Sequence, residues 1–279
     1  MTVDSRFYLD DRHHLVEKAT AFLLALNEGE HHGIQKAVYV QSPDVLVDKS
    51  FPLTFFDRIY YGVELCEKRI PSPRLLKEML HICDSSGKPL TLMTPLVTDR
   101  GIEQLEPLLQ MLAEHDEKAE VVVNEYGALM FIREKFPSLQ VVMGRVLMRQ
   151  KKDPRVAAIR DEKIRGYFSG SILDNPYFCK FIREQGVERV EVDNLPHADP
   201  PQTDFSMSIY YPFVLITTSR NCVAETCEEC TLVHYNLYHP IMGDELIFYG
   251  RSQFVVNLRF DWLKFRQFDR VIYQHYIPF

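Results

Sequence analysis

The stretch "AEVVVNEYGALMFIREKFPSLQVVMGRVLM" runs from Ala119 to Met148 and alternates two kinds of segment. A short apolar run at 121–123 is followed by a helix-forming stretch at 128–136, and a second apolar run follows at 141–143. Short apolar strands that alternate with amphipathic helices are typical of parallel βαβ units, because their strands are buried on both faces. The stretch therefore predicts a strand, a helix and a second, parallel strand.

The same alternation extends in both directions along the chain. The strands that it predicts lie at 36–40, 57–62, 88–97, 119–127, 139–148, 187–196, 211–222 and 269–276. About eight such units favour an α/β fold of the (β/α)8 TIM-like barrel type over a doubly wound sheet. The hairpin-like segment "DELIFYGRSQFVVNL" (244–258) interrupts the alternation. We therefore expect a barrel that is irregular or incomplete at its C-terminal end.

The beginning of the chain differs from the rest. The segment "LVEKATAFLLALNEG" (15–29) has apolar residues at helical spacing and ends at a glycine, which commonly stops a helix. We expect an N-terminal helical arm over residues 1–33, buried against the barrel or a partner. No linker rich in Pro, Gly or Ser divides the remainder of the chain, so residues 34–279 are expected to form one barrel domain.

Composition and charge exclude several classes of protein. The 279 residues are 46% hydrophobic and 25% charged, as in an ordinary globular protein. No apolar run is long enough for a membrane span, and the acidic N-terminus lacks an apolar signal region, so we expect a cytoplasmic protein. A net charge of −7 argues against non-specific nucleic-acid binding. The basic run "RQKKDPR" (149–155) is expected to be a solvated loop.

Six cysteines are too few for a disulfide scaffold, and their grouping suggests a metal site instead. Cys222, Cys227 and Cys230 are spaced C-x4-C-x2-C, and Cys66 follows the predicted strand at 57–62. Functional groups collect at the C-terminal ends of barrel strands, so we expect all four thiols on one rim. The other two cysteines, at 83 and 179, fall within predicted helices and are expected to pack in the core.

Four thiolates suit either a tetrahedral Zn2+ ion or an iron–sulfur cluster. His234 follows Cys230 at a spacing that makes Cys222, Cys227, Cys230 and His234 a zinc alternative. The irregular spacing with one remote cysteine, Cys66, favours a [4Fe–4S] cluster over zinc. Reduced thiols without metal are the third interpretation.

Polar residues follow three of the predicted strands. Asn124 and Glu125 follow the fourth, Arg145 the fifth, and Asp193 and Asn194 the sixth. On a barrel rim they would converge beside the cysteines, where Arg145 could pair with a carboxylate and Glu125 or Asp193 could move protons. Asn124, Glu125, Arg145 and Asp193 are therefore the candidate catalytic residues. The alternative is that they cap helices and stabilise loops.

Several segments resemble the peptidase U32 (collagenase-like) family, in the family's order, over residues 35–235. In "DRIYYGVELCEKR" (57–69) a "VYLG"-like strand end precedes a cysteine and a basic pair. The segments at 86–97, 121–148 and 186–194 resemble those that come next in the family, and "YYPFVLITTSRNC" (210–222) is similar to its cysteine-rich strand end. The resemblance is closest to the short, single-domain branch linked to oxygen-independent ubiquinone hydroxylation.

That branch binds a [4Fe–4S] cluster through one remote and three grouped cysteines and works as a heterodimer. The resemblance therefore implies that Cys66, Cys222, Cys227 and Cys230 are cluster ligands and that a second U32-like subunit is the partner. The chain departs from the branch in the tighter spacing of its grouped cysteines and in its N-terminal arm.

The resemblance implies an iron–sulfur protein that acts in an oxygen-independent hydroxylation or a related redox reaction. Its substrate would be a quinone precursor, another small aromatic molecule or an RNA base. Such a redox role is favoured over a peptidase, since neither a G-x-S-x-G elbow nor an H-E-x-x-H helix is present. Ligation by four thiolates favours electron transfer or structural support. The alternative function is a zinc-stabilised barrel that serves as a non-catalytic binding subunit.

Overall fold

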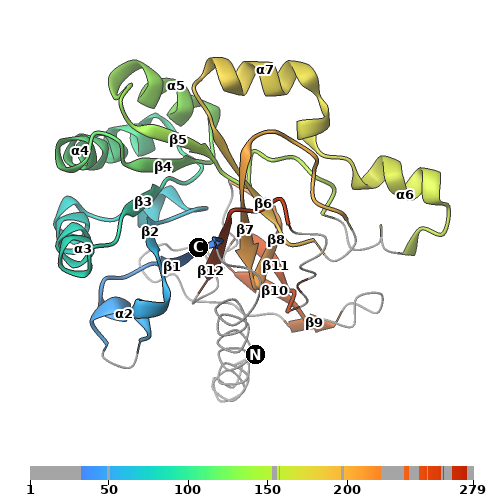
Figure 1. Cartoon of the computed structure of the whole chain (residues 1–279), viewed down its shortest axis with the longest axis horizontal. Helices are drawn as coiled ribbons and strands as arrows, with labels where there is room; N and C mark the ends of the chain where they lie inside the picture. Colours follow the sequence, from blue (N-terminus) through green and yellow to red (C-terminus); the bar gives the residue numbers. More distant parts are fainter. Residues whose placement is uncertain are drawn as a thin grey trace.

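The computed structural model describes residues 33–48, 51–152, 156, 158–195, 198–220, 236–238, 245–249, 251–258, 260 and 266–274. Its centre is a closed barrel of eight parallel strands, in the order β1-β12-β7-β6-β5-β4-β3-β2 (Figure 1). These strands are β1 (Gln35–Val40), β2 (Arg58–Gly62), β3 (Leu90–Met93), β4 (Glu120–Val123), β5 (Gln140–Met143), β6 (Arg189–Asp193), β7 (Ser206–Tyr211) and β12 (Arg270–Gln274). The predicted TIM-like barrel is confirmed.

Helices surround the outside of the first six strands, as Figure 1 shows for α2 to α5 and α7. The helices are α2 (Asp44–Val47), α3 (Pro73–Ser86), α4 (Asp99–His115), α5 (Tyr126–Lys135), α6 (Glu162–Ser169) and α7 (Pro176–Glu184), with 3-10 turns η1 (Leu53–Phe55), η2 (Glu67–Arg69) and η4 (Ile172–Asp174). The ends of α3 follow local rules, because Ser72 caps its first turn and Gly87 ends it at a φ of 64°.

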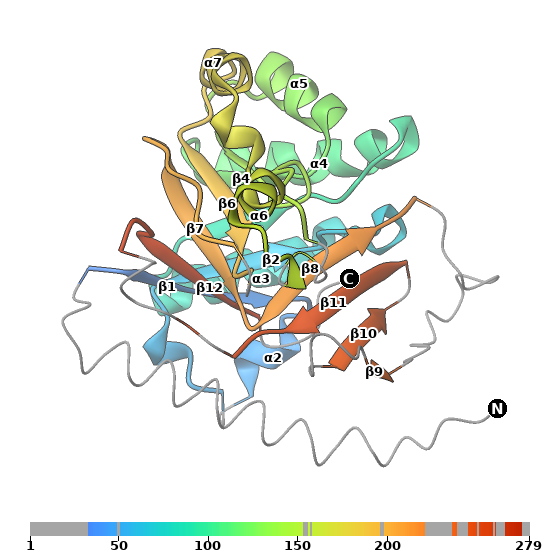
Figure 2. The same cartoon turned by 90° about the vertical axis from the view of Figure 1, so that its right-hand side faces the viewer.

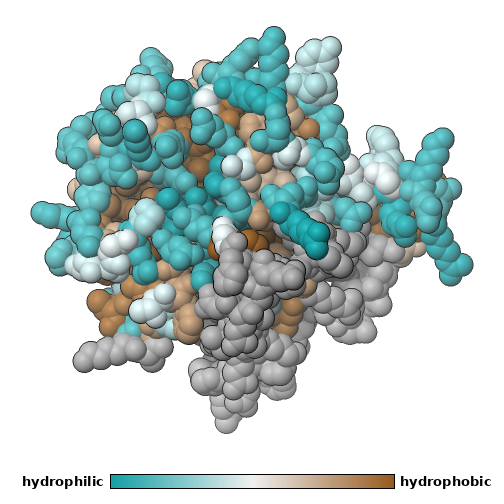
Figure 3. Space-filling model, in the orientation of Figure 1, coloured by the Kyte–Doolittle hydropathy of each residue, from teal (hydrophilic) through white to brown (hydrophobic). Residues whose placement is uncertain are grey.

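The three valines of β4 show why a barrel strand reads as a continuous apolar run. Val122 points into the barrel and packs with Tyr60 and Tyr210, while Val121 and Val123 belong to the cluster between strands and helices. Successive side chains of a strand alternate between its faces, and here both faces are buried. On the face seen in Figure 3, hydrophilic residues cover most of the outer surface of the helices.

The chain between β7 and β12 forms a separate four-stranded antiparallel sheet, whose strands lie side by side in Figure 2. Its order is β8-β11-β10-β9, formed by β8 (Phe213–Thr218), β9 (Asn236–Tyr238), β10 (Glu245–Tyr249) and β11 (Ser252–Val256). The hairpin expected at 244–258 is the β10–β11 pair. This sheet interrupts the alternation of strands and helices, so the irregularity expected at the C-terminal end is confirmed. The barrel itself is closed, so the alternative of an incomplete barrel was wrong.

The prediction of the seventh barrel strand at 211–222 was wrong. The barrel strand is β7, and Phe213–Thr218 belongs to the antiparallel sheet instead. The apolar run continues across Pro212, which has no N–H to donate to a strand ladder, and the two strands meet there. Cys222 therefore follows a strand of the antiparallel sheet, not of the barrel.

Two expectations concern residues that the structure does not describe. Most of the proposed arm (1–33) precedes Gly33, so the arm and the domain boundary stay predictions. Cys222, Cys227, Cys230 and His234 also lie outside the described residues. In the described part of the chain, no helix combines the length and apolar character that a membrane crossing requires.

Gly62, the last residue of β2, is expected to tolerate no side chain. Its φ is +122°, and a Cβ atom there would lie 2.4 Å from the backbone oxygen of Met93 on β3. We expect Gly62→Ala to lower the free energy of unfolding by about 2–4 kcal/mol, because backbone strain and overpacking add. Urea denaturation measures the loss.

Two other glycines provide graded controls for this substitution. Gly87 has a φ of +64° but no atom within 4 Å of an added Cβ, whereas Gly166 has neither a positive φ nor a close neighbour. Gly87→Ala should cost about 1 kcal/mol and Gly166→Ala should be neutral or stabilising. Equal effects at Gly62 and Gly166 would contradict the close approach of β2 and β3.

Candidate site at the carboxyl end of the barrel

The antiparallel sheet is packed on loops that follow barrel strands at their carboxyl ends. Phe213 and Leu215 of β8 and Phe254 of β11 form one buried cluster with Leu65, which lies in the loop after β2. Val146, in the loop after β5, packs against the same cluster. The sheet is therefore held at the end of the barrel where functional groups collect in this fold.

Arg145 is the centre of the contact between the sheet and the barrel. Its Nε and Nη2 donate to the two carboxylate oxygens of Glu64 at 2.6 and 2.7 Å. Its Nη1 donates to Asp193 Oδ1 and to the Phe213 carbonyl oxygen, each at 2.8 Å. The guanidinium also lies 3.9 Å from the centre of the Tyr210 ring. One side chain thus joins the ends of three barrel strands to β8.

Asp193 has further partners that complete this network. Its Oδ1 accepts a hydrogen bond from the backbone N–H of Leu215 at 2.8 Å, and its Oδ2 pairs with the Lys152 ammonium group. Arg145, Glu64 and Asp193 have no exposed side-chain surface, and the Lys152 side chain is 12% exposed. Two cations and two carboxylates are therefore balanced in a nearly dry environment. The expectation that Lys152 lies in a solvated loop was wrong.

The charge state of Arg145 follows from these neighbours. Burial alone would lower its pKa, but the carboxylates of Glu64 and Asp193 outweigh burial and raise the pKa of the guanidinium above its ordinary value. Arg145 is therefore a permanent cation. Four of its five N–H donors are engaged, so its role within the described residues is to hold the sheet and the rim together.

The remaining candidate catalytic residues have different neighbours. Asn124 is fully buried; its Nδ2 donates to the Thr94 carbonyl at 3.0 Å, and its Oδ1 accepts from the Val146 N–H at 3.4 Å. Glu125 caps α5, accepting a hydrogen bond from the Ala128 N–H at 3.1 Å. The structure thus brings Arg145 and Asp193 into contact and links Asn124 to the loop after β5, whereas Glu125 is engaged by its own helix.

Cys66 lies in the same loop as Glu64 and Leu65, and it is a half-buried free thiol. The loop is held on both sides of it. Leu65 packs under the added sheet, and the Glu67 carboxylate accepts hydrogen bonds from the N–H and hydroxyl of Thr98 at 2.7 and 2.9 Å. The backbone at Cys66 is therefore fixed by neighbours from two other parts of the rim.

Arg251 connects this loop to the chain that leads toward the grouped cysteines. Its Nη2 donates to the carbonyl oxygen of Leu65, and its Nη1 donates to the carbonyl oxygen of Arg220 at 2.9 Å. Leu65 directly precedes Cys66, and Arg220 lies two residues before Cys222. One guanidinium group therefore spans the two segments that carry the remote and the first grouped cysteine.

Of the four predicted ligands, Cys66 is the one that lies in the described residues. Within the described residues no three His, Cys, Asp or Glu side chains form a group that could hold a metal, and three of the four predicted ligands lie outside those residues. Cys66 fits a ligand role because its thiol is partly accessible and its backbone is fixed. Cys83 and Cys179 are buried in the core, as predicted, and burial raises the pKa of the Cys83 thiol to about 12.

Polar side chains fill the interior of the barrel from Arg145 toward the amino ends of the strands. We call this set, which is Tyr210, Glu191, Tyr60, Arg270 and Glu120, the polar column. Tyr210, under the Arg145 guanidinium, donates its hydroxyl to Glu191 Oε2 at 2.6 Å. Tyr60 accepts from Arg270 Nη1 at 2.7 Å, and Arg270 also binds both oxygens of Glu120 near the opposite end. TIM barrels are usually filled by branched apolar side chains, so this polar interior is unusual.

The two carboxyl groups of the column differ in their proton affinity. Burial raises the pKa of Glu191 to about 7, although the hydrogen bond from Tyr210 partly opposes the change. Its Oε1 is buried without a hydrogen-bond partner among the described residues. Burial would also raise the pKa of Glu120, but the hydrogen bonds and charge of Arg270 outweigh it and lower the pKa to about 2.

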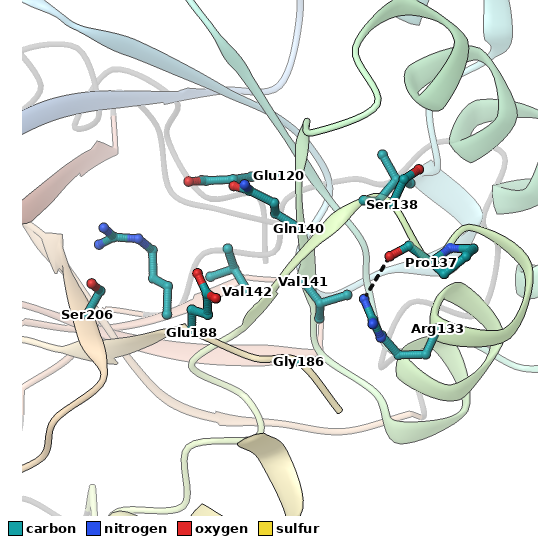
Figure 4. A pocket seen from close by; sticks show the side chains of 12 residues that line it. Glu120, Arg133, Pro137, Ser138, Gln140, Val141, Val142, Gly186, Glu188 and Ser206 are labelled. Atoms are coloured by element: carbon teal, nitrogen blue, oxygen red, sulfur yellow. Dashed lines mark hydrogen bonds between the residues drawn. The ribbon is translucent and has the colours of Figure 1, made fainter. Parts of the chain in front are cut away.

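A cavity of about 280 Å³ lies at the amino end of the barrel, far from Cys66 along the strands. In Figure 4, Glu120 and Gln140 extend toward the same space as Glu188 and Ser206. Two of its charged residues are paired within the protein: Glu120 binds Arg270, and Arg189 binds Asp269 through two hydrogen bonds. The cavity offers no arrangement of groups that indicates a reaction.

Sequence reasoning missed Glu64, Lys152 and Tyr210 as members of the rim network. Glu64 is the one acid in the run "YYGVEL", directly after a buried strand, and a carboxylate at such a place requires a cation. That signal could have paired it with Arg145. Lys152 lies in a basic run that resembles any exposed loop, so nothing in its local sequence distinguishes it.

Comparisons with known proteins include a match to a solved structure. No family model matches the chain, and no curated protein matches it. A solved structure of the U32 peptidase Mk0906 is similar over 88% of this chain and 94% of that chain, with 13% sequence identity and a TM-score of 0.43.

Proposed function

We propose that the chain is a U32-like iron–sulfur protein that acts in an oxygen-independent hydroxylation or a related redox reaction. Cys66, Cys222, Cys227 and Cys230 would bind a [4Fe–4S] cluster at the carboxyl end of the barrel. A quinone precursor, another small aromatic molecule or an RNA base would be the substrate. A second U32-like subunit would be the partner.

The observation that supports this proposal is the shared contact of Arg251 with Leu65 and Arg220. A cluster with one remote ligand requires that the remote cysteine lie near the grouped ones. Cys66 directly follows Leu65, and Cys222 is two residues after Arg220. Because consecutive Cα atoms are about 3.8 Å apart, each cysteine is at most two residue steps from a residue whose carbonyl group Arg251 binds. The resemblance of the sequence to the quinone branch supplies the type of cluster.

A bound [4Fe–4S] cluster would supply one-electron transfer. The residues of the chain would hold its environment in place. Arg145, with Glu64 and Asp193, fastens β8 to the rim, and β8 leads into the segment with the grouped cysteines. Leu65, Phe213 and Phe254 exclude water on one side of the Cys66 loop.

Metal analysis of anaerobically purified protein tests the proposal. We expect about four iron and four sulfide per chain and broad visible absorption, since four thiolates suit a cubane cluster. Cys66→Ala should lose the iron as completely as Cys227→Ala. Cys83→Ala is the matched control, because Cys83 lies on the buried face of α3 and its loss should leave the metal bound.

Two outcomes would contradict the cluster. Stoichiometric zinc without sulfide would support the zinc-stabilised binding subunit instead. Full metal content in Cys66→Ala would remove Cys66 from the ligand set and favour His234 as the fourth ligand.

A further inference from the structure

We propose that Arg251 is a positioning residue, which holds the Cys66 loop and the segment leading to Cys222 together before any metal binds; the proposal rests on the cluster proposed above. Arg251 acts through the two backbone carbonyls that it binds, those of Leu65 and Arg220.

The position of Arg251 is fixed by strand pairing. Arg251 directly precedes β11, where Ser252 pairs with Thr218 of β8 and the two hydroxyl groups are 2.8 Å apart. The ladder continues one residue further, because the Ser219 N–H donates to the Arg251 carbonyl at 3.2 Å. The backbone of Arg251 is thus bound to the end of β8, and its side chain reaches across to the barrel loop.

The loop that receives this side chain is equally fixed. Leu65 is 1% exposed and packs against Phe213, Leu215 and Phe254, and Glu67 is bonded to Thr98. Both bridged segments are therefore positioned by contacts with the rest of the protein. A preorganised pair of ligand segments lowers the entropy that metal binding must overcome.

Arginine is better suited to binding two carbonyl oxygens at once than glutamine, which is uncharged. A guanidinium presents several N–H donors in a rigid plane, so it can bind two carbonyl oxygens at once. The Lys ammonium keeps the charge but lacks the planar fork. We therefore expect Arg251→Lys to retain part of the effect and Arg251→Gln to lose nearly all of it.

Cross-linking of the metal-free protein tests the proposal. In full-length chain with Cys227→Ser and Cys230→Ser, a short bis-maleimide links two thiols by adding one to each of its double bonds. We expect rapid linkage of Cys66 to Cys222, read by mass spectrometry. Arg251→Gln should slow it about tenfold, the equivalent of one charge-assisted hydrogen bond, with Arg251→Lys between the two.

Arg189→Gln is the matched control, because Arg189 also binds two partners, Asp269 and Ser208, but at the amino end of the barrel. It should lower the unfolding temperature without changing the rate of cross-linking. Equal rates with and without Arg251, or slow linkage in the chain that retains Arg251, would overturn the proposal. If Arg251→Gln does not fold, unchanged linkage in Arg251→Lys overturns it as well.

The two proposals fail in different ways. Fast, Arg251-dependent linkage in a protein that contains no iron or sulfide would retain the positioning role and reject the cluster. In protein with a full cluster, Arg251→Gln should speed iron loss to a chelator about tenfold, whereas Arg189→Gln should not.

Discussion

Arg145→Met is expected to lower the free energy of unfolding by about 3–5 kcal/mol, because it leaves Glu64 and Asp193 buried without their shared cation. It also removes the hydrogen bond that holds the Phe213 carbonyl of β8. Urea denaturation followed by fluorescence measures the loss. Hydrogen exchange at the Leu215 amide, which Asp193 binds, should accelerate at the same time.

Two comparisons make this result specific. Arg183→Gln removes a cation that pairs with Asp204 on the surface, where the side chains are 47% and 76% exposed, and should cost at most about 1 kcal/mol. The double variant Glu64→Leu with Arg145→Met removes the closest buried pair together and should recover part of the loss. A change under about 1 kcal/mol in Arg145→Met would show that the network does not hold the sheet.

Glu191→Gln is expected to be more stable than the wild type at pH 8 by up to about 3 kcal/mol and close to it at pH 5. The folded protein raises the pKa of Glu191 from its ordinary 4.5 to about 7. The folded state therefore binds this proton more tightly than the unfolded state. The contribution of Glu191 to stability is fully present below pH 4.5 and is lost as the pH rises to 7.

The groups around Glu191 decide the size of this effect. Tyr210 donates a hydrogen bond to it, Glu64 repels its charge and Arg270 attracts it. Urea denaturation of both proteins from pH 5 to 8 gives the difference directly. Parallel curves would contradict a protonated Glu191.

Glu120→Gln is the control of opposite sign within the same column. Arg270 holds the pKa of Glu120 at about 2, so the contribution of this carboxylate is present above pH 4.5 and lost as the pH falls. Glu120→Gln should therefore destabilise the protein at neutral pH, where Glu191→Gln stabilises it.

Hydrophobic periodicity predicted most of the barrel. Runs such as Val121–Val123 are apolar because both of their faces are buried, and this property is local enough to read from sequence. The seventh strand was misplaced because Phe213–Thr218 begins with the more continuous apolar run, whereas the barrel strand Ser206–Tyr211 contains two serines. Membership of a barrel or of an added sheet depends on distant pairing partners.

The candidate site was predictable only where a residue follows a strand. Arg145 and Asp193 could be placed on one rim by that rule, and they are in contact. Their burial could not be predicted, because it arises from the sheet that packs over them. Arg251 was not predicted, since its role depends on carbonyl groups that are 31 and 186 residues away in the sequence.

The position of β12 has a consequence for synthesis of the chain. This strand lies between β1 and β7 and pairs in parallel with both. Until residues 270–274 leave the ribosome, the other seven barrel strands form an open sheet whose two edges, β1 and β7, have unpaired backbone groups. Such edges can pair with other nascent chains. Barrel closure therefore waits for the last of the eight strands, and a chain stopped before residue 270 should aggregate rather than fold.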